Sequence, residues 1–109
     1  MRTASILFKN EQAGILSQLD DGTFTFKYIP SWLSDSRKPS ISLTLPKTDH
    51  EFHSNHLFSF FFNMLPEGTN KLIACKLNRI DQTDYFGLLL TTARYDSIGA
   101  VRVIKLEEA

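Results

Sequence analysis

The first 28 residues restrict the fold most, because they contain three short segments in which apolar and polar residues alternate. The segments span residues 3–9, 13–19 and 23–28, and an alternation of period two places the apolar side chains on one face of a β-strand. The first connection, residues 10–12, reads as a turn. The second, residues 20–22 with the sequence DDG, offers a glycine for the positive φ of a tight turn. The pattern therefore predicts three antiparallel strands joined in chain order.

Glycine, proline and polar residues further along the chain predict local structure. Gly14, inside the second segment, predicts a bulge or a close backbone approach. Pro30 predicts a single helical turn, because proline is favoured in the first turn of a helix. Residues 40–46 alternate again, so we expect another strand there, and the polar residues 47–55 predict a loop. The apolar face of that strand would carry Ile41, Leu43 and Leu45.

The second half of the chain has helical spacing, and three helices are predicted, each near a residue that can cap or start a helix. They span residues 55–64, 67–77 and 83–90. A turn over 96–99 and a closing strand over 100–105 follow. We therefore expect one α+β domain over residues 1–109. In it, about three helices pack together on a small, curved, partly barrel-like antiparallel sheet of about five strands.

Composition limits the function classes. Lys plus Arg equals Asp plus Glu, 12 against 12, so the chain lacks the cationic excess with which proteins bind nucleic acid; a small β-barrel that stacks bases on aromatics is disfavoured for the same reason. A single cysteine, Cys75, cannot form an internal disulfide, and its apolar neighbours predict a buried or half-buried thiol. No apolar run approaches the ~20 residues of a membrane span, and the N-terminus does not resemble a signal peptide. We expect a cytoplasmic protein that contacts neither membrane nor nucleic acid directly.

The segment 57–65 is the most aromatic part of the chain. On a helix its apolar residues fill an arc of about 200°, twice the width of an ordinary apolar stripe. One face carries Leu57, Phe58, Phe61, Met64 and Leu65, whereas Phe60 and Phe62 lie on opposite flanks. Two interpretations remain open. Either the domain itself covers the helix on two sides, or one flank is a contact surface for another protein. Trp32, the single tryptophan, is expected in the core rather than at an interface.

The sequence LFSFFFNMLPEG at 57–68 resembles the segment that leads into a Leu-Pro-Glu-Gly signature in the N-terminal subdomain of HipA-type serine/threonine kinases. Other pieces resemble that subdomain in the same order, so the resemblance covers nearly the whole chain. They lie at residues 13–16, 24–33, 40–46, 84–89 and 96–101. Two positions depart from the pattern. Arg94 replaces a usual glycine, and Thr69 stands where some relatives carry a tryptophan, which argues against an aromatic plug at that position.

What the resemblance implies is a binding protein rather than an enzyme. A kinase needs a nucleotide-binding loop, a phosphate-anchoring lysine, and catalytic and metal-binding aspartates; none of these motifs is present, and the chain ends where the kinase body would begin. In tripartite HipBST toxin–antitoxin systems, a small protein of this kind (HipS) accompanies a shortened kinase toxin (HipT) and a helix-turn-helix protein (HipB). The resemblance implies an antitoxin or regulatory subunit that restrains a HipT-like kinase, in a complex that a HipB-like protein can join. The alternative is a non-inhibitory module that links kinase and repressor.

The expected contact surface is the corner between the first two predicted helices, because it is polar, rigid and next to the aromatic flank. Its residues are Phe60, Phe62, Asn63, Pro66, Glu67, Gly68 and Thr69. The free N–H groups there can instead bind an anion, although the simpler interpretation is that Pro66 starts a helix and Glu67 favours its dipole.

A metal site, a cofactor and a catalytic residue are not expected. His50, His53 and His56 recur every three residues, which is a possible metal-ligand spacing. The segment reads as a loop rather than a preformed frame, and on a helix the third histidine would rotate away from the first.

Overall fold

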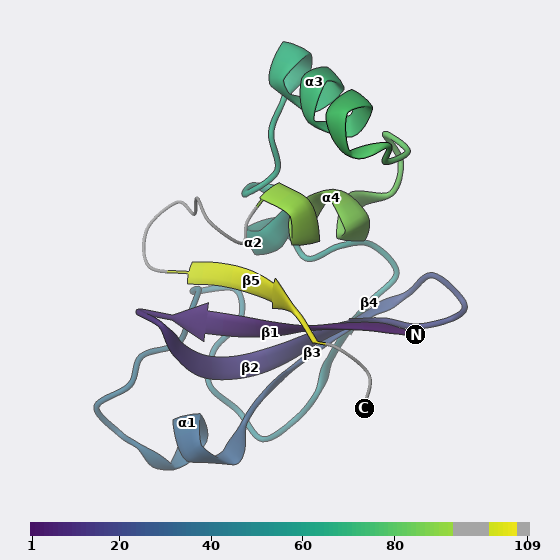
Figure 1. The fold of residues 1–109 in the computed structure, drawn as a ribbon. Helices are drawn as coiled ribbons and strands as arrows, with labels where there is room; N and C mark the ends of the chain where they lie inside the picture. Colours follow the sequence, from purple (N-terminus) through teal and green to yellow (C-terminus); the bar gives the residue numbers. More distant parts are fainter. Residues whose placement is uncertain (93–100, 107–109) are drawn as a thin grey trace.

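Five antiparallel strands form one open sheet, in the order β4-β3-β2-β1-β5, in the computed structural model of the chain (Figure 1). The structure describes residues 1–92 and 101–106, so Arg94 and the predicted turn over 96–99 lie outside the described residues. The strands are β1 (Arg2–Phe8), β2 (Glu11–Gln18), β3 (Phe24–Tyr28), β4 (Phe52–Ser54) and β5 (Val101–Lys105). The helices are α1 (Pro30–Ser34), α2 (Ser59–Phe62), α3 (Gly68–Asn78) and α4 (Tyr85–Thr92). The predicted α+β class is confirmed.

The predicted three-stranded meander is confirmed, with its first turn slightly earlier than expected. Phe8 pairs with Glu11 across a two-residue turn whose residues, Lys9 and Asn10, have φ of 49° and 68°. Two successive positive φ values define a type I′ turn, whose twist matches that of the flanking strands. The second turn places Gly22 at φ 87°, as its residue type predicts.

Gly14 has both of the roles predicted for it. Ile6 pairs with Gly14 while Leu7 pairs with Gln12, so the register shifts next to the glycine, as in a β-bulge. A Cβ at Gly14 would lie 2.7 Å from the Phe26 ring. The missing side chain lets neighbouring Phe26 occupy that space in the core.

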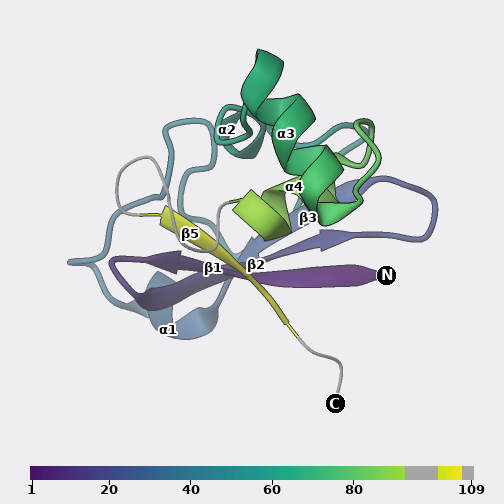
Figure 2. The same cartoon turned by 45° about the horizontal axis from the view of Figure 1, so that its top comes forward.

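The helices lie at different distances from the sheet. In Figures 1 and 2, α2 and α4 lie on one side of the sheet, and α3 extends beyond α4, away from the strands. Helix α3 therefore packs on α4 rather than directly on the sheet. On α1, Trp32 is 3% exposed and its indole N–H donates to the carbonyl of Pro39 at 2.8 Å, so its expected place in the core is confirmed.

The predicted strand over 40–46 is wrong. An isolated bridge between Ser42 and Leu45 closes a tight turn instead, and Leu43, expected beside its apolar neighbours, is fully exposed. The hydroxyl of Tyr28 fixes this turn, because it accepts the Ile41 N–H at 3.0 Å and donates to the carbonyl of Leu45. Ile41 and Leu45, near the two ends of the alternating pattern, are buried. A reverse turn can bury these two residues as well as a strand can.

The next two expectations also change. Residues 47–55 contain β4 as well as loop, because Phe52 pairs with Phe26 at the edge of β3. The helix predicted over 55–64 is shortened to α2, since Ser54 belongs to β4 and its hydroxyl accepts the N–H of His56. The chain therefore reaches the aromatic segment in an extended conformation and makes only a single helical turn there.

Candidate functional site: the corner between α2 and α3

The aromatic segment divides into buried and exposed residues. Phe61 is fully buried, and its ring centroid lies 5.8 Å from that of Phe26 on the sheet. Phe60 is half-buried against Phe61, with 5.2 Å between the ring centroids. Phe62 points outward and is 46% exposed. The domain thus covers one flank of this segment and leaves the other exposed, which keeps the second flank as a candidate contact surface. Phe60 helps the core, and Phe62 is available at the surface.

Phe62 is held in place although it is exposed. Its ring meets that of Tyr85 edge to face, 5.4 Å between centroids. The ammonium of Lys71, on α3, lies 5.3 Å from the centroid of the Tyr85 ring, a cation–π contact. These three side chains join α2, α3 and α4 into one surface. A preformed aromatic surface loses little side-chain entropy on binding, which favours its use as an anchor for a partner.

The remaining predicted contact residues line the connection from α2 to α3. Asn63, Glu67 and Thr69 are exposed, Pro66 is half-buried, and Gly68 is exposed at φ +56°. Helix α3 begins at Gly68 rather than at Glu67, and Glu67 occupies the cap position without a side-chain capping bond. Its carboxylate is therefore free to face a partner. Of the seven predicted residues, Phe62 and Asn63 lie together at the surface pocket described below. Pro66 to Thr69 follow along the connection to α3, and Phe60 lies on the more buried flank.

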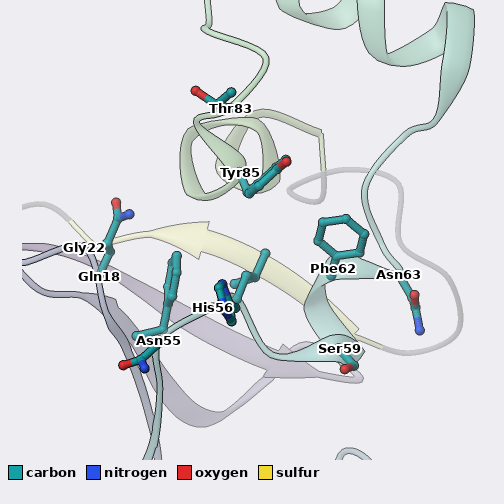
Figure 3. Close-up of a pocket in the computed structure, with 11 residues that line it drawn as sticks. Gln18, Gly22, Asn55, His56, Ser59, Phe62, Asn63, Thr83 and Tyr85 are labelled. Carbon is teal, nitrogen blue, oxygen red and sulfur yellow. The ribbon is translucent and has the colours of Figure 1, made fainter.

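A pocket of about 490 Å³ lies beside this corner (Figure 3). Phe62 and Asn63 belong to its lining, but most of the lining residues are not among the predicted contact residues. Those residues are Gln18, Gly22, Phe24, Asn55, His56, Leu57, Ser59, Thr83 and Tyr85. None of them is Asp, Glu, Lys or Arg, so the pocket is uncharged at neutral pH when His56 is neutral. Such a pocket suits a polar, uncharged group rather than a phosphate or a metal ion.

The histidines are not gathered into a metal site. His53 lies on β4, His50 lies in the loop before it, and His56 lies in the loop after it, at the pocket. Within residues 1–92 and 101–106, no group of three or more His, Cys, Asp or Glu is placed to hold a metal ion. Cys75 is 5% exposed, which confirms the expected burial of the thiol.

A second exposed apolar surface, on α3, was not predicted from the sequence. Leu72, Ile73 and Leu77 have helical spacing, which normally indicates a core-facing stripe, yet they are 51%, 50% and 77% exposed on α3. Cys75, not these three, is the buried residue of the helix. Among the described helices, none is long and apolar enough to cross a membrane.

Comparison with known proteins identifies the fold family. The family model described as the HipA N-terminal domain matches residues 4–104. The chain belongs to the HipA N-terminal domain family. A solved structure titled "N-terminal domain of HipA toxin" is similar over 100% of this chain and 96% of that chain, at a TM-score of 0.72 and 28% identity. The family resemblance expected from the sequence is thereby confirmed.

Two relatives of this HipA N-terminal domain differ in length. A protein of Haemophilus influenzae named "Uncharacterized protein" is 32% identical over 103 residues, 94% of this chain and 92% of that protein. A protein of Sinorhizobium fredii named "Putative kinase Y4mE" is 26% identical over 82% of this chain, but the match covers only 21% of that protein. The same domain thus occurs both in a protein of similar size and as a small part of a longer one.

Proposed function

We propose that this chain is a HipS-like regulatory subunit that binds a HipA-like serine/threonine kinase of the HipT type and restrains it. The single observation that carries the proposal is the exposed Phe62 on a rigid aromatic support, in a domain of the HipA N-terminal family. The match to 21% of the relative named as a kinase supports it, because the domain there is attached to a much longer chain. The kinase contact is made by the corner from Phe60 to Thr69.

The chemistry of the corner suits regulation rather than catalysis. Within the described residues, the predicted contact side chains include no nucleophile paired with a base and no cluster of carboxylates, and the matched family model describes the N-terminal domain of HipA. Phe62 supplies apolar area, and Glu67 supplies a charge that can pair with a cation on the kinase. The site of action that we propose is the cytoplasm, where Cys75 would stay reduced.

Co-purification tests the proposal. The chain is co-expressed with the HipA-like kinase encoded nearest to it, and complex formation and kinase autophosphorylation are measured. We expect the chain to lower autophosphorylation. Phe62→Ala and Glu67→Ala should each weaken binding by about tenfold, as for hot-spot residues. Leu43→Ala, which removes a fully exposed leucine elsewhere, is the matched control and should leave binding unchanged. Unaltered autophosphorylation and no complex would reject the proposal.

A non-inhibitory assembly module that links kinase and HipB-like repressor is the alternative, and the exposed face of α3 favours it, because a linker needs a second contact surface. Growth separates the two functions. Co-expression with the kinase restores growth if the chain restrains the enzyme, whereas a linker forms the complex without restoring growth.

A further inference from the structure

The outward face of α3 is an apolar surface that the domain does not cover. Leu72, Ile73 and Leu77 are each at least half exposed. At ~100° per residue, Ile73 and Leu77 form one row along the helix, and Leu72 begins the neighbouring row. Figure 1 shows α3 beyond α4, on the side away from the sheet. Exposed apolar side chains gathered on one helix indicate an interface rather than a solvated surface.

The charges on α3 and its C-cap residue have one sign, whereas the acidic residues Glu67 and Asp81 lie just before and just after this segment. Between Gly68 and Ile80 the chain carries Lys71, Lys76 and Arg79 and no acidic residue. Lys76 and Arg79 are exposed, while Lys71 lies over the Tyr85 ring. At ~100° per residue Lys76 lies between Leu72 and Ile73, so the face combines apolar side chains with a basic one, and Arg79 adds a second positive charge at its end, although the whole chain has no net charge.

A hollow of about 500 Å³ lies at the end of the face, between α3 and the segment that follows it. Its lining combines apolar side chains, among them Leu72 and Ile80, with the buried Cys75. The acid in this lining is Asp81, whose carboxylate accepts hydrogen bonds from the N–H and the hydroxyl of Thr83 at 2.8 and 2.6 Å. The hollow can receive an apolar side chain of a partner, while Lys76 at its edge attracts a carboxylate.

We infer that α3 binds an amphipathic helical segment of another protein, with an apolar stripe bordered by Asp or Glu. Charge complementarity selects this occupant. A second copy of the chain is disfavoured, because a two-fold contact centred on the row of Ile73 and Leu77 would bring the Lys76 ammonium groups of the two copies near each other, and α3 carries no carboxylate to pair with them. The length of α3, 11 residues or about 16 Å, matches a helix of three to four turns. Rows of side chains at helical spacing recognise such a helix through interlocking apolar residues.

Synthetic peptides test the inference on the full chain. One peptide of about 14 residues, or roughly four helical turns, carries a Leu stripe bordered by Glu; the other has Lys in place of every Glu. Binding is measured by calorimetry and by amide chemical shifts. We expect the Glu peptide to bind about tenfold more tightly than the Lys peptide, and its affinity to fall as salt rises from about 50 to about 500 mM.

Matched variants locate the contact. Ile73→Asn with Leu77→Asn should abolish binding of the Glu peptide, whereas Leu43→Asn makes the same change at a fully exposed leucine elsewhere and should not. Lys76→Glu should weaken binding, and Lys27→Glu, an exposed lysine on β3, should not. Phe62→Ala and Glu67→Ala should keep peptide binding, so failure of the α3 proposal is distinguishable from failure of kinase binding at the corner.

Three results would overturn the inference. The first is equal affinity for the two peptides. The second is sedimentation that shows a dimer of the chain dissolved by Ile73→Asn. The third is binding to phosphatidylglycerol vesicles, lost in the same variant, without binding of the Glu peptide, because a basic apolar helix also suits an anionic membrane surface.

Discussion

Arg2 and Asp84, which are 82 positions apart in the chain, form a two-point ion pair that ties β1 to the start of α4. The two guanidinium nitrogens lie 3.1 and 2.6 Å from the two carboxylate oxygens. One of these oxygens also accepts the Gly87 N–H at 3.1 Å, so Asp84 caps α4. The Arg2 guanidinium further lies 5.1 Å from the Phe86 ring centroid. Since α4 carries Tyr85, this pair positions one support of Phe62.

Asp84→Asn should remove the negative charge of this ion pair while keeping the helix cap, because asparagine also caps helices well. The two side chains are 41% and 33% exposed, so we expect a loss of about 1 kcal/mol in the free energy of unfolding at pH 7, below that of a buried pair. The hydrogen bond from Arg2 holds the pKa of Asp84 below its ordinary 3.8.

The stabilisation from this lowered pKa is present above pH 3.8 and is lost as pH falls through the folded-state pKa. Urea unfolding of the wild type and Asp84→Asn should therefore converge as pH falls from 7 towards 2. Asp49→Asn, at an exposed carboxylate, is the control and should show a smaller difference at pH 7. A constant gap at all pH values would show that the ion pair does not stabilise the fold.

Gly87→Ala should destabilise the protein, although alanine ordinarily favours a helix interior over glycine by about 0.5–1 kcal/mol. A Cβ at this position would lie 2.3 Å from the Oδ2 atom of Asp84. The carboxylate would have to leave Arg2, so we expect a net loss of about 1 kcal/mol in the free energy of unfolding. In an Asp84→Ala background the obstacle is gone, and the same substitution should stabilise. This reversal of sign, measured in a double-mutant cycle, is the result that tests the contact.

The sequence predicted those elements whose local chemistry is decisive. The first three strands follow from alternation and from a DDG turn, and the boundaries of α3 and α4 are close to the predicted ones. The predicted apolar face is covered by the domain even though α2 is much shorter than expected. Leu57, Phe61 and Leu65 are buried, and Phe58 and Met64 are half-buried. The spacing of the side chains indicated which residues share the covered face, but it did not predict the length of the helix.

Other features depend on contacts between distant segments, which spacing does not encode. The turn over 40–46 needs the Tyr28 hydroxyl, and β4 needs the free edge of β3. The exposure of Leu72, Ile73 and Leu77 follows from where α3 lies relative to α4, although their helical spacing would equally suit a buried stripe. The pocket beside Phe62 draws on the β2–β3 turn, the loop after β4 and the start of α4, so its composition emerged only from the fold.

Tyr28→Phe should loosen the turn over 40–46. The Ile41 N–H and the Leu45 carbonyl would both lose a buried partner, at a cost of about 1–3 kcal/mol. Hydrogen exchange of the Ile41 amide should become faster in the variant. Urea unfolding should show the loss in the free energy of unfolding. Burial raises the pKa of Tyr28 above 10.0. The wild type should therefore lose stability as pH rises above 10 through the folded-state pKa, and the variant should lack that part of the decline. Tyr85→Phe is the control; equal losses in both variants would contradict the role of the Tyr28 hydroxyl.

Lys9→Asn with Asn10→Gly should stabilise the β1–β2 hairpin without touching any proposed contact surface. Both wild-type residues hold positive φ, 49° and 68°, which costs an L-residue with a Cβ more than it costs glycine. Asn-Gly is the preferred pair for a type I′ turn. We expect a gain of about 1 kcal/mol in the free energy of unfolding, seen as a higher midpoint in urea at an unchanged slope. Lys9→Ala alone tests whether removal of the lysine accounts for the gain, since alanine accepts positive φ poorly and should not stabilise. Binding of the kinase at the α2–α3 corner should be the same in the stabilised variant, because the turn lies outside that corner and its pocket.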